Sequence, residues 1–292
     1  VLLWFYMVDE KDLLVVSLII ALSSSFMTNL GSYKLANAQN SSCSEELMPS
    51  SPNNAIPVIL IHGYYQDYSV WSEWEGLLKG SVPYCTVSFI RSNDKCGTAT
   101  DHADELNEIV QGVKNITHQK QVNLVGHSKG GLDARVYLAK SQTHDVANLI
   151  MIGTPNGGSP LADFITSFIS LIPSSNSSSF FCTPALYDWK TDAQATQVRE
   201  NPHTSYYTIY GNWNPLLPCG HGGSEGIVYT ILNFIGYTIL NFGHVPNDGI
   251  VPKWSVEDLN NYTNLGYTFH CHTDLLGSQE YNLSKSVLVS GR

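Results

Sequence analysis

The chain has 292 residues, of which 43% are hydrophobic and 14% are charged, and its formal net charge is −10. The acidic balance and the lack of a basic run exclude a nucleic-acid partner from our expectations. The length and apolar content are sufficient for one domain with a sizeable buried core.

The first 38 residues differ from the rest of the chain. Residues 13–22 form an apolar run that is short for a membrane span. Ala36-Asn37-Ala38 follows with the small-x-small pattern of a signal cleavage site. We expect a signal peptide over residues 1–38 and one domain over residues 39–292. Because acidic residues precede the apolar run, an uncleaved membrane anchor is the alternative, and either makes the protein secreted or extracytoplasmic.

The remaining sequence alternates between segments typical of strands and segments typical of helices. This alternation predicts an α/β fold, a mostly parallel sheet with helices on both faces. We expect strands at 57–62, 83–90, 121–126, 147–152, 205–211 and 265–270, helices at 101–116 and 129–140, and a closing helix.

Two segments do not fit this pattern, and we interpret both as a cap over the functional site. They span about residues 157–190 and 214–245. The second contains a direct repeat, Tyr-Thr-Ile-Leu-Asn-Phe, at 229–234 and 237–242, and residues 226–242 are apolar and uncharged. Such a segment is either buried core or a lid whose outer edge meets a lipid surface.

Residues 126–130, Gly-His-Ser-Lys-Gly, have the form of a nucleophile elbow. Residues 122–125 precede this pentapeptide as an apolar strand, and residues with helical spacing follow it. The flanking glycines permit a turn too tight for a Cβ, which raises the Ser128 hydroxyl above the sheet. The sequence therefore predicts Ser128 as a nucleophile.

The expected order in this fold is Ser, then an acid, then His. Asp248 lies in the polar turn 246–250, where Gly249 interrupts the strand, and we expect this aspartate to be exposed. Only His270 and His272 follow it. We favour His272 as the base because it opens the loop before the last helix, and His270 reads as a half-buried strand residue.

The oxyanion hole is expected from two backbone N–H groups, one after the first strand and one after the nucleophile. By position these belong to Tyr64 and Lys129. We expect the charged side chain of Lys129 to be solvated. We expect His62 to pack and hydrogen-bond beneath the site without transferring a proton.

Five segments in order resemble the bacterial and archaeal triacylglycerol lipases of the α/β-hydrolase fold. They are residues 57–63, 126–131, 152–160, 247–251 and 272–276, and the resemblance spans about residues 55–290. It implies ester hydrolysis through an acyl-enzyme: Ser128 attacks, His272 carries the proton and Asp248 orients the imidazole. The implied partner is an ester or lipid substrate, with contact to a lipid interface.

Some lipases of this type hold a calcium ion near the catalytic histidine, with an aspartate two residues after it, where this chain has Asp274. The second aspartate of that site is missing, because no aspartate lies between Asp192 and Asp248. A calcium site needs several oxygen ligands. We therefore expect no metal and no cofactor, and we expect Asp274 to cap the last helix.

All six cysteines follow residue 38, and none has a metal-like spacing. An even number in an exported chain predicts disulfides, although six cysteines allow fifteen pairings. Cys85–Cys96 is the expected local pair, and Cys182–Cys219 is a further candidate.

Other functions use similar residues. A lactonase or polyester hydrolase would use the same triad, and peptidases and thioesterases would look alike. A non-catalytic surface binding protein on a hydrolase scaffold is the alternative from another class, but no triad member is missing.

Overall fold

The computed structural model describes residue 43 and residues 55–142, 144–170, 182–217, 219, 233, 235–240 and 244–289. Backbone contacts divide the chain into Val1–Gln39 and Asn40–Arg292. The signal peptide or anchor expected over residues 1–38 lies outside the described residues, and the following description concerns the second unit. Within the described ranges, no helix combines the length and hydropathy that crossing a membrane requires.

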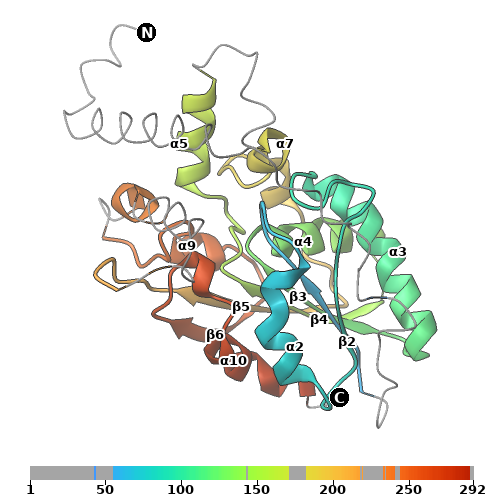
Figure 1. Ribbon diagram of the computed structural model, residues 1–292. Helices are drawn as coiled ribbons and strands as arrows, with labels where there is room; N and C mark the ends of the chain where they lie inside the picture. The colour runs from blue at the N-terminus through green and yellow to red at the C-terminus, as the bar shows by residue number, and fades with distance from the viewer. Residues whose placement is uncertain are drawn as a thin grey trace, which may run out of the picture. The chain divides into compact units, whose positions relative to one another are not determined.

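The centre of the fold is a six-stranded sheet in the order β2-β1-β3-β4-β5-β6. Every neighbouring pair is parallel. The α/β class predicted from the alternation is therefore confirmed (Figure 1). The strands are β1 (Val58–Ile61), β2 (Tyr84–Thr86), β3 (Val122–His127), β4 (Val146–Ile152), β5 (Ser205–Gly211) and β6 (Thr263–Thr268).

Helices cover both faces of the sheet, and the alternation of side chains along β1 shows why. Ile59 and Ile61 pack on one face with α3 (Ala99–Thr117) and α4 (Lys129–Ser141). Val58 and Leu60 point to the opposite face, which is covered by α2 (Ser72–Leu78) and α10 (Ser278–Val289). Because both faces are covered, β1 carries four apolar residues in a row, all fully buried.

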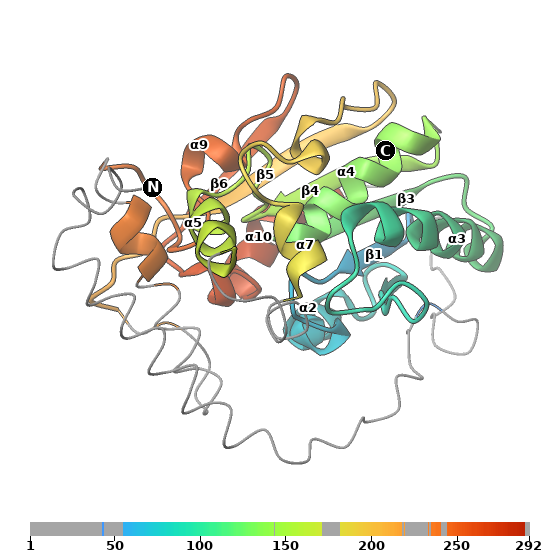
Figure 2. The same ribbon diagram turned by 90° about the horizontal axis from the view of Figure 1, so that it is seen from above.

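The first predicted cap segment contains two helices that contact each other, α5 (Pro160–Ile169) and α7 (Thr183–Tyr187) (Figure 2). They share a small apolar cluster with α4, formed by Leu132, Ala162, Ile169, Leu186 and Trp189. We call the described parts of residues 157–190 and 214–245 the cap. Most of its second segment lies outside the described residues, but residues 235–240 are helical and bury Ile235 and Leu240.

Short elements complete the fold, and two expected strands and one expected helix cap differ from the structure. The short elements are the 3₁₀ turns η2 (Tyr68–Trp71), η3 (Gln194–Gln197) and η4 (His272–Asp274) and the helix α9 (Lys253–Val256).

The strand expected at 83–90 ends at Thr86, because the following backbone turns so that the Phe89 N–H donates to the Asp94 carboxylate. The last strand lies two residues earlier than expected, so His270 is outside it. Asp274 ends η4 and does not cap the last helix, which starts at Ser278.

All six cysteines are paired, but neither expected pair is present. The disulfides are Cys43–Cys85, Cys96–Cys182 and Cys219–Cys271. The expected pairs Cys85–Cys96 and Cys182–Cys219 are wrong, because sequence proximity does not report which Cα atoms the fold brings within bonding range. Cys85 lies inside β2 and pairs with residue 43, whereas Cys182 starts α7 and pairs with the loop before α3. Each cysteine is therefore bonded to its neighbour in chain order.

Peptide mapping without reduction should recover these three pairs and no Cys85–Cys96 peptide. Replacing Cys96 and Cys182 together with alanine should lower the free energy of unfolding by about 2–4 kcal/mol, because their bond closes a long loop. Urea denaturation of the oxidised proteins measures this. A double variant as stable as the wild type would show that the bond does not constrain the unfolded chain.

Candidate active site

Ser128 stands between β3 and α4 in a strained backbone conformation, with φ 54° and ψ −129°. The turn is closed by glycines at positions where a side chain would collide. A Cβ on Gly126 would lie 2.5 Å from the Gly131 nitrogen, and a Cβ on Gly130 would lie 2.4 Å from the His62 carbonyl oxygen. Contacts below 3 Å are not tolerated, so the spacing of glycines in the sequence reflects a steric requirement. Strain of this kind persists only where surrounding structure enforces it.

A continuous hydrogen-bonded chain connects Ser128, His272 and Asp248. The Ser128 Oγ is 2.8 Å from His272 Nε2, and His272 Nδ1 is 2.7 Å from Asp248 Oδ2. These residues come from the turn after β3, the turn before α9 and the loop after β6. The fold thus brings together the three residues singled out in the sequence. Ser128 remains partly accessible, whereas the two others are buried.

Asp248 is fully buried, which corrects the expectation that its turn exposes it. A buried carboxylate must be satisfied by hydrogen bonds. Its Oδ1 accepts the N–H groups of Ile250 and Val251 at 2.9 and 2.7 Å, while Oδ2 faces the imidazole. Gly249 permits this turn through a φ of 95°. The Asp248 carbonyl also accepts the backbone N–H of His272 at 2.9 Å, so the acid fixes both the ring and the backbone of its partner.

His127 supports the loop that carries His272. Its Nε2 lies 3.0 Å from the His272 carbonyl, and the two rings are 5.0 Å apart. Burial, followed by the nearby His272, holds the pKa of His127 well below its ordinary value. A neutral imidazole therefore supports the loop without adding a second positive charge beside His272.

The two residues expected to form the oxyanion hole flank Ser128. The loop after β1 passes so close that a Cβ on Gly63 would lie 2.9 Å from the Ser128 Cβ, and Tyr64 follows directly. This loop is fastened from below, as the buried His62 lies 2.9 Å from Asp94 Oδ1. Burial opposes ionisation of Asp94, but hydrogen bonds from His62 and from the Phe89 N–H outweigh it and lower the pKa of Asp94.

Lys129 begins α4, and its side chain is buried, which overturns the expectation of a solvated charge. The ammonium Nζ donates to Asp133 Oδ1 at 2.6 Å and lies 3.4 Å from His102 Nδ1. His102 in turn lies 2.8 Å from the other Asp133 oxygen. A cation without carboxylate partners could not be held in this environment.

Asp188, which follows α7, is the second carboxylate near this ammonium, with Oδ2 4.0 Å from Lys129 Nζ. It also accepts the Ala99 N–H at 2.6 Å. Burial is the largest influence on this carboxyl, and the charge of Asp133 adds to it. Despite Lys129, these effects raise the pKa of Asp188 to about 6.

Sequence reasoning did not find the residues that support the site. Gln66 accepts the Gly63 N–H at 2.9 Å and contacts His127, and Asp94 fastens His62. No motif marks either residue. The i,i+4 spacing of Lys129 and Asp133 on one helix was a usable signal for their pairing.

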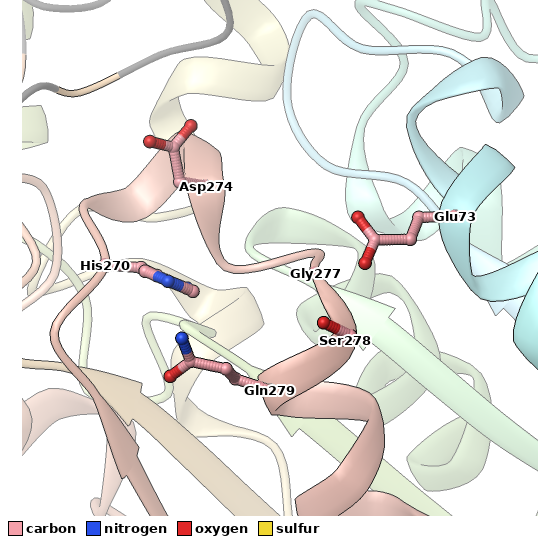
Figure 3. Close-up of a pocket in the computed structure, with 6 residues that line it drawn as sticks. All are labelled: Glu73, His270, Asp274, Gly277, Ser278 and Gln279. Carbon is pink, nitrogen blue, oxygen red and sulfur yellow. The ribbon is translucent and has the colours of Figure 1, made fainter.

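A surface pocket lies near the start of α10, and Ser128, Asp248 and His272 are not among its lining residues. Its lining residues are Glu73, His270, Asp274, Gly277, Ser278 and Gln279 (Figure 3). His270, the alternative base, contacts Glu280 at 2.8 Å instead of Ser128. This hydrogen bond, supported by the charges of Glu280, Asp274 and Glu73, raises the pKa of His270.

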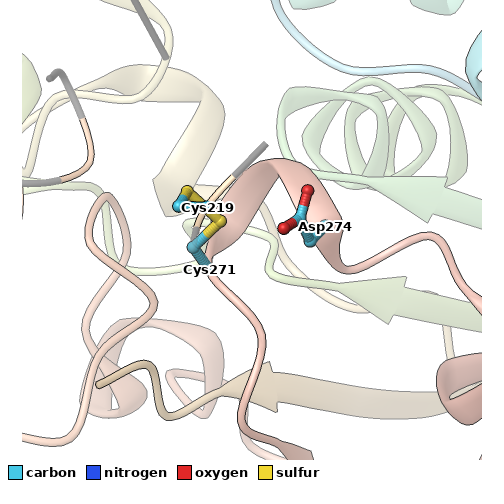
Figure 4. Close-up of side chains that lie close together, drawn as sticks. All are labelled: Cys219, Cys271 and Asp274. Carbon is cyan, nitrogen blue, oxygen red and sulfur yellow. A yellow bond between two sulfur atoms is a disulfide. The ribbon is translucent and has the colours of Figure 1, made fainter. Parts of the chain in front are cut away.

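Cys219, Cys271 and Asp274 lie close enough together to suggest a metal site (Figure 4). The two sulfur atoms are joined in a disulfide, however, so neither is a thiolate. The cluster then offers only the Asp274 carboxylate. The disulfide is instead a covalent link, because it ties Cys271, the residue directly before His272, to Cys219 in the cap.

A parallel sheet that presents a serine on a strand–turn–helix elbow, with its acid and histidine on later loops, defines an α/β-hydrolase. The family model of palmitoyl protein thioesterases matches residues 57–216, more than half of the chain. The chain belongs to this family.

The chain is similar to curated relatives and to solved structures. The chain is 33% identical over 184 residues to triacylglycerol lipases of Pseudarthrobacter phenanthrenivorans and Burkholderia plantarii, covering 58% of this chain and 56% and 50% of theirs. It thus spans about half the length of these relatives. The crystal structure of mature Bacillus licheniformis lipase BlEst2 matches with a TM-score of 0.64 at 21% identity, covering 82% of this chain and 96% of that one. Staphylococcus hyicus lipase matches with a TM-score of 0.52 at 14% identity, covering 83% and 98%.

Asp188 should make stability depend on pH. Because its pKa is raised from 3.8 to about 6, the folded protein holds this proton more tightly than the unfolded chain does. The resulting stabilisation is fully present below pH 4 and is lost as the pH rises through 6. Relative to Asp188→Asn, the wild-type free energy of unfolding should fall by about 2 kcal/mol between pH 4 and pH 7. Denaturation at several pH values tests this, and a difference that is constant or grows with pH would contradict it.

Proposed function

We propose that the protein is a serine hydrolase that cleaves carboxylic esters of the lipase and esterase type through an acyl-enzyme. The observation that carries this proposal is the hydrogen-bonded chain from the Ser128 Oγ through His272 to the buried Asp248. Similarity to triacylglycerol lipases supports an ester or lipid as substrate.

In this mechanism the Ser128 Oγ attacks the carbonyl carbon while His272 Nε2 takes its proton. The tetrahedral oxyanion accepts hydrogen bonds from the backbone N–H groups of Tyr64 and Lys129. Collapse breaks the ester bond, and His272 gives the proton to the leaving alcohol. Water then attacks the acyl-enzyme by the same route, which releases the acid and restores Ser128. Asp248 holds the imidazole in the required tautomer and stabilises its positive form.

A second candidate is hydrolysis of acyl thioesters, which the match to palmitoyl protein thioesterases favours. The same residues would act, with a thiol as leaving group. Lactones and polyesters would be cleaved in the same way, by attack of the Ser128 Oγ on their ester carbonyl carbon. A panel of p-nitrophenyl esters from acetate to palmitate, an emulsified triglyceride, a lactone and palmitoyl thioester separates these substrates.

The three disulfides support a location outside the cytoplasm, since such bonds persist in oxidising compartments. We propose that residues 39–292 form the hydrolase domain. Residues 1–38 would direct its export as a cleaved signal or retain it at a membrane as an anchor. The cap is the part proposed to contact a lipid surface.

Ser128→Ala and His272→Ala should each reduce kcat for p-nitrophenyl butyrate by at least about 1000-fold, because triad members act as one unit. Asp248→Asn should retain more activity. His270→Ala is the matched control two residues from the proposed base: its partner is Glu280, so kcat should stay within about threefold. If His270→Ala were inactive while His272→Ala were active, the assignment of the base would be wrong.

Ile235→Ser and Ile239→Ser test whether the cap serves long acyl chains. Ile235 is buried, and the adjacent Gly236 packs so closely that an added Cβ would meet the Gly249 carbonyl and Leu161 of α5. We expect these variants to lose more activity on emulsified long-chain esters than on soluble butyrate.

Leu77→Ser on α2 provides a matched apolar-to-serine control and should affect both substrates equally. Equal losses on both substrate types in the cap variants would mean that the segment is core and not a lid.

A further inference from the structure

The cap helix α7 is followed by two residues that contact both proposed oxyanion-hole residues. The Asp188 carboxylate lies 4.0 Å from the ammonium of Lys129. The next residue, Trp189, places its ring 5.6 Å from the ring of Tyr64. One dipeptide therefore contacts the two residues whose N–H groups flank Ser128, although Tyr64 lies in the loop after β1 and Lys129 begins α4 after β3.

Both ends of α7 are fixed to the segment that starts α3. At the first end, Cys182 forms a disulfide with Cys96. At the other end, Asp188 accepts the N–H of Ala99, the first residue of α3, at 2.6 Å. A helix held at both ends cannot slide relative to α3, so the position of the dipeptide after it is well defined.

The contact with Lys129 is part of a buried charge network. Lys129 and Asp133 belong to α4, His102 to α3, and Asp188 follows α7. Apolar residues of similar volume are commonly as stabilising as a buried ion pair. Unlike apolar contacts, paired charges fix the orientation of the elements that carry them. Here the network fixes the start of α4, where the Lys129 N–H lies, relative to α3 and α7.

Trp189 also reaches the turn that carries Asp248. Its carbonyl accepts the Ser159 N–H at 2.8 Å, and the Ser159 hydroxyl donates to the Ile250 carbonyl at 2.5 Å. The Ile250 N–H in turn donates to Asp248. The dipeptide is therefore linked through hydrogen bonds to the acid and through side chains to both oxyanion-hole residues.

We propose that Asp188 and Trp189 are positioning residues that set the two oxyanion-hole N–H groups from the cap, an inference that rests on the proposed function. The N–H groups stabilise the oxyanion only at hydrogen-bond distance from the position that it occupies in the transition state. Loss of either contact lets a donor drift by a fraction of an ångström. Catalysis then slows, while binding of the ground-state ester changes little.

Asp188→Ala and Trp189→Leu test this on a short soluble ester, p-nitrophenyl butyrate. Removal of one oxyanion donor costs about 10²–10³-fold in kcat, so displacement should cost about 10–100-fold. KM should stay within about threefold of the wild type. Phenylboronic acid, which forms a tetrahedral adduct with an active serine, should bind more weakly by a factor similar to the loss in kcat.

Tyr187→Leu is the matched control, because Tyr187 ends the same helix but is exposed. It should leave kcat within about twofold. Trp189→Phe keeps a ring against Tyr64 and should restore most of the activity, and Asp188→Asn keeps an acceptor for Ala99 and should lie between Ala and wild type. Titration of active serines with a p-nitrophenyl phosphonate corrects each rate for misfolded protein.

The inference is overturned if Asp188→Ala matches the wild type in kcat, or if the losses appear in KM with unchanged boronic-acid affinity. If Trp189→Leu fails to fold, Asp188→Ala and Trp189→Phe still decide the outcome. A wild type that hydrolyses neither esters nor thioesters would refute the proposed function itself. An active wild type with fully active variants would refute only this inference.

Discussion

The burial of the Asp248 carboxylate is the constraint on which the arrangement of the site depends. A charge with no exposure to water requires a donor at each oxygen. Two backbone N–H groups and one imidazole provide them, and they can do so only if the chain turns at Gly249 and the loop after β6 returns to this turn. The same carboxylate that orients His272 thereby determines the course of two loops. The Cys219–Cys271 bond secures the second loop directly before the histidine.

The site is also supported by a layer of polar residues beneath its backbone. His62 with Asp94 holds the loop after β1, and Lys129 with Asp133 holds the start of α4. Phe89 lies between the two groups, 5.8 Å from the His62 ring and stacked at 3.9 Å on the His102 ring. The loop after β1 and the start of α4, which flank Ser128, thus both rest on groups that are hydrogen-bonded and packed together.

The fold and the residues of the hydrogen-bonded chain, Ser128, His272 and Asp248, could be predicted because they depend on local patterns. The alternation of strand-like and helix-like segments predicted the six strands, β5 to the residue, although β2 and β6 differ in their bounds. The glycines around Ser128 reflect a collision that any side chain would cause. The order of residues along the chain then left two histidines, and the structure places His272 beside Ser128. The disulfide pairs, the burial of Asp248 and the pairing of Lys129 depend instead on contacts between distant segments, which no local pattern records.

The chain-order pairing of the cysteines bears on how the protein is made. The bonds join 43 to 85, 96 to 182 and 219 to 271, so no covalent loop encloses or crosses another. When a chain enters an oxidising compartment from its N-terminus, the two cysteines of each of these pairs would arrive one directly after the other. Oxidation in that order would yield the native set without a reshuffling step. Ser128 is enclosed by the second loop and Asp248 by the third, and the third loop closes at Cys271, directly before His272.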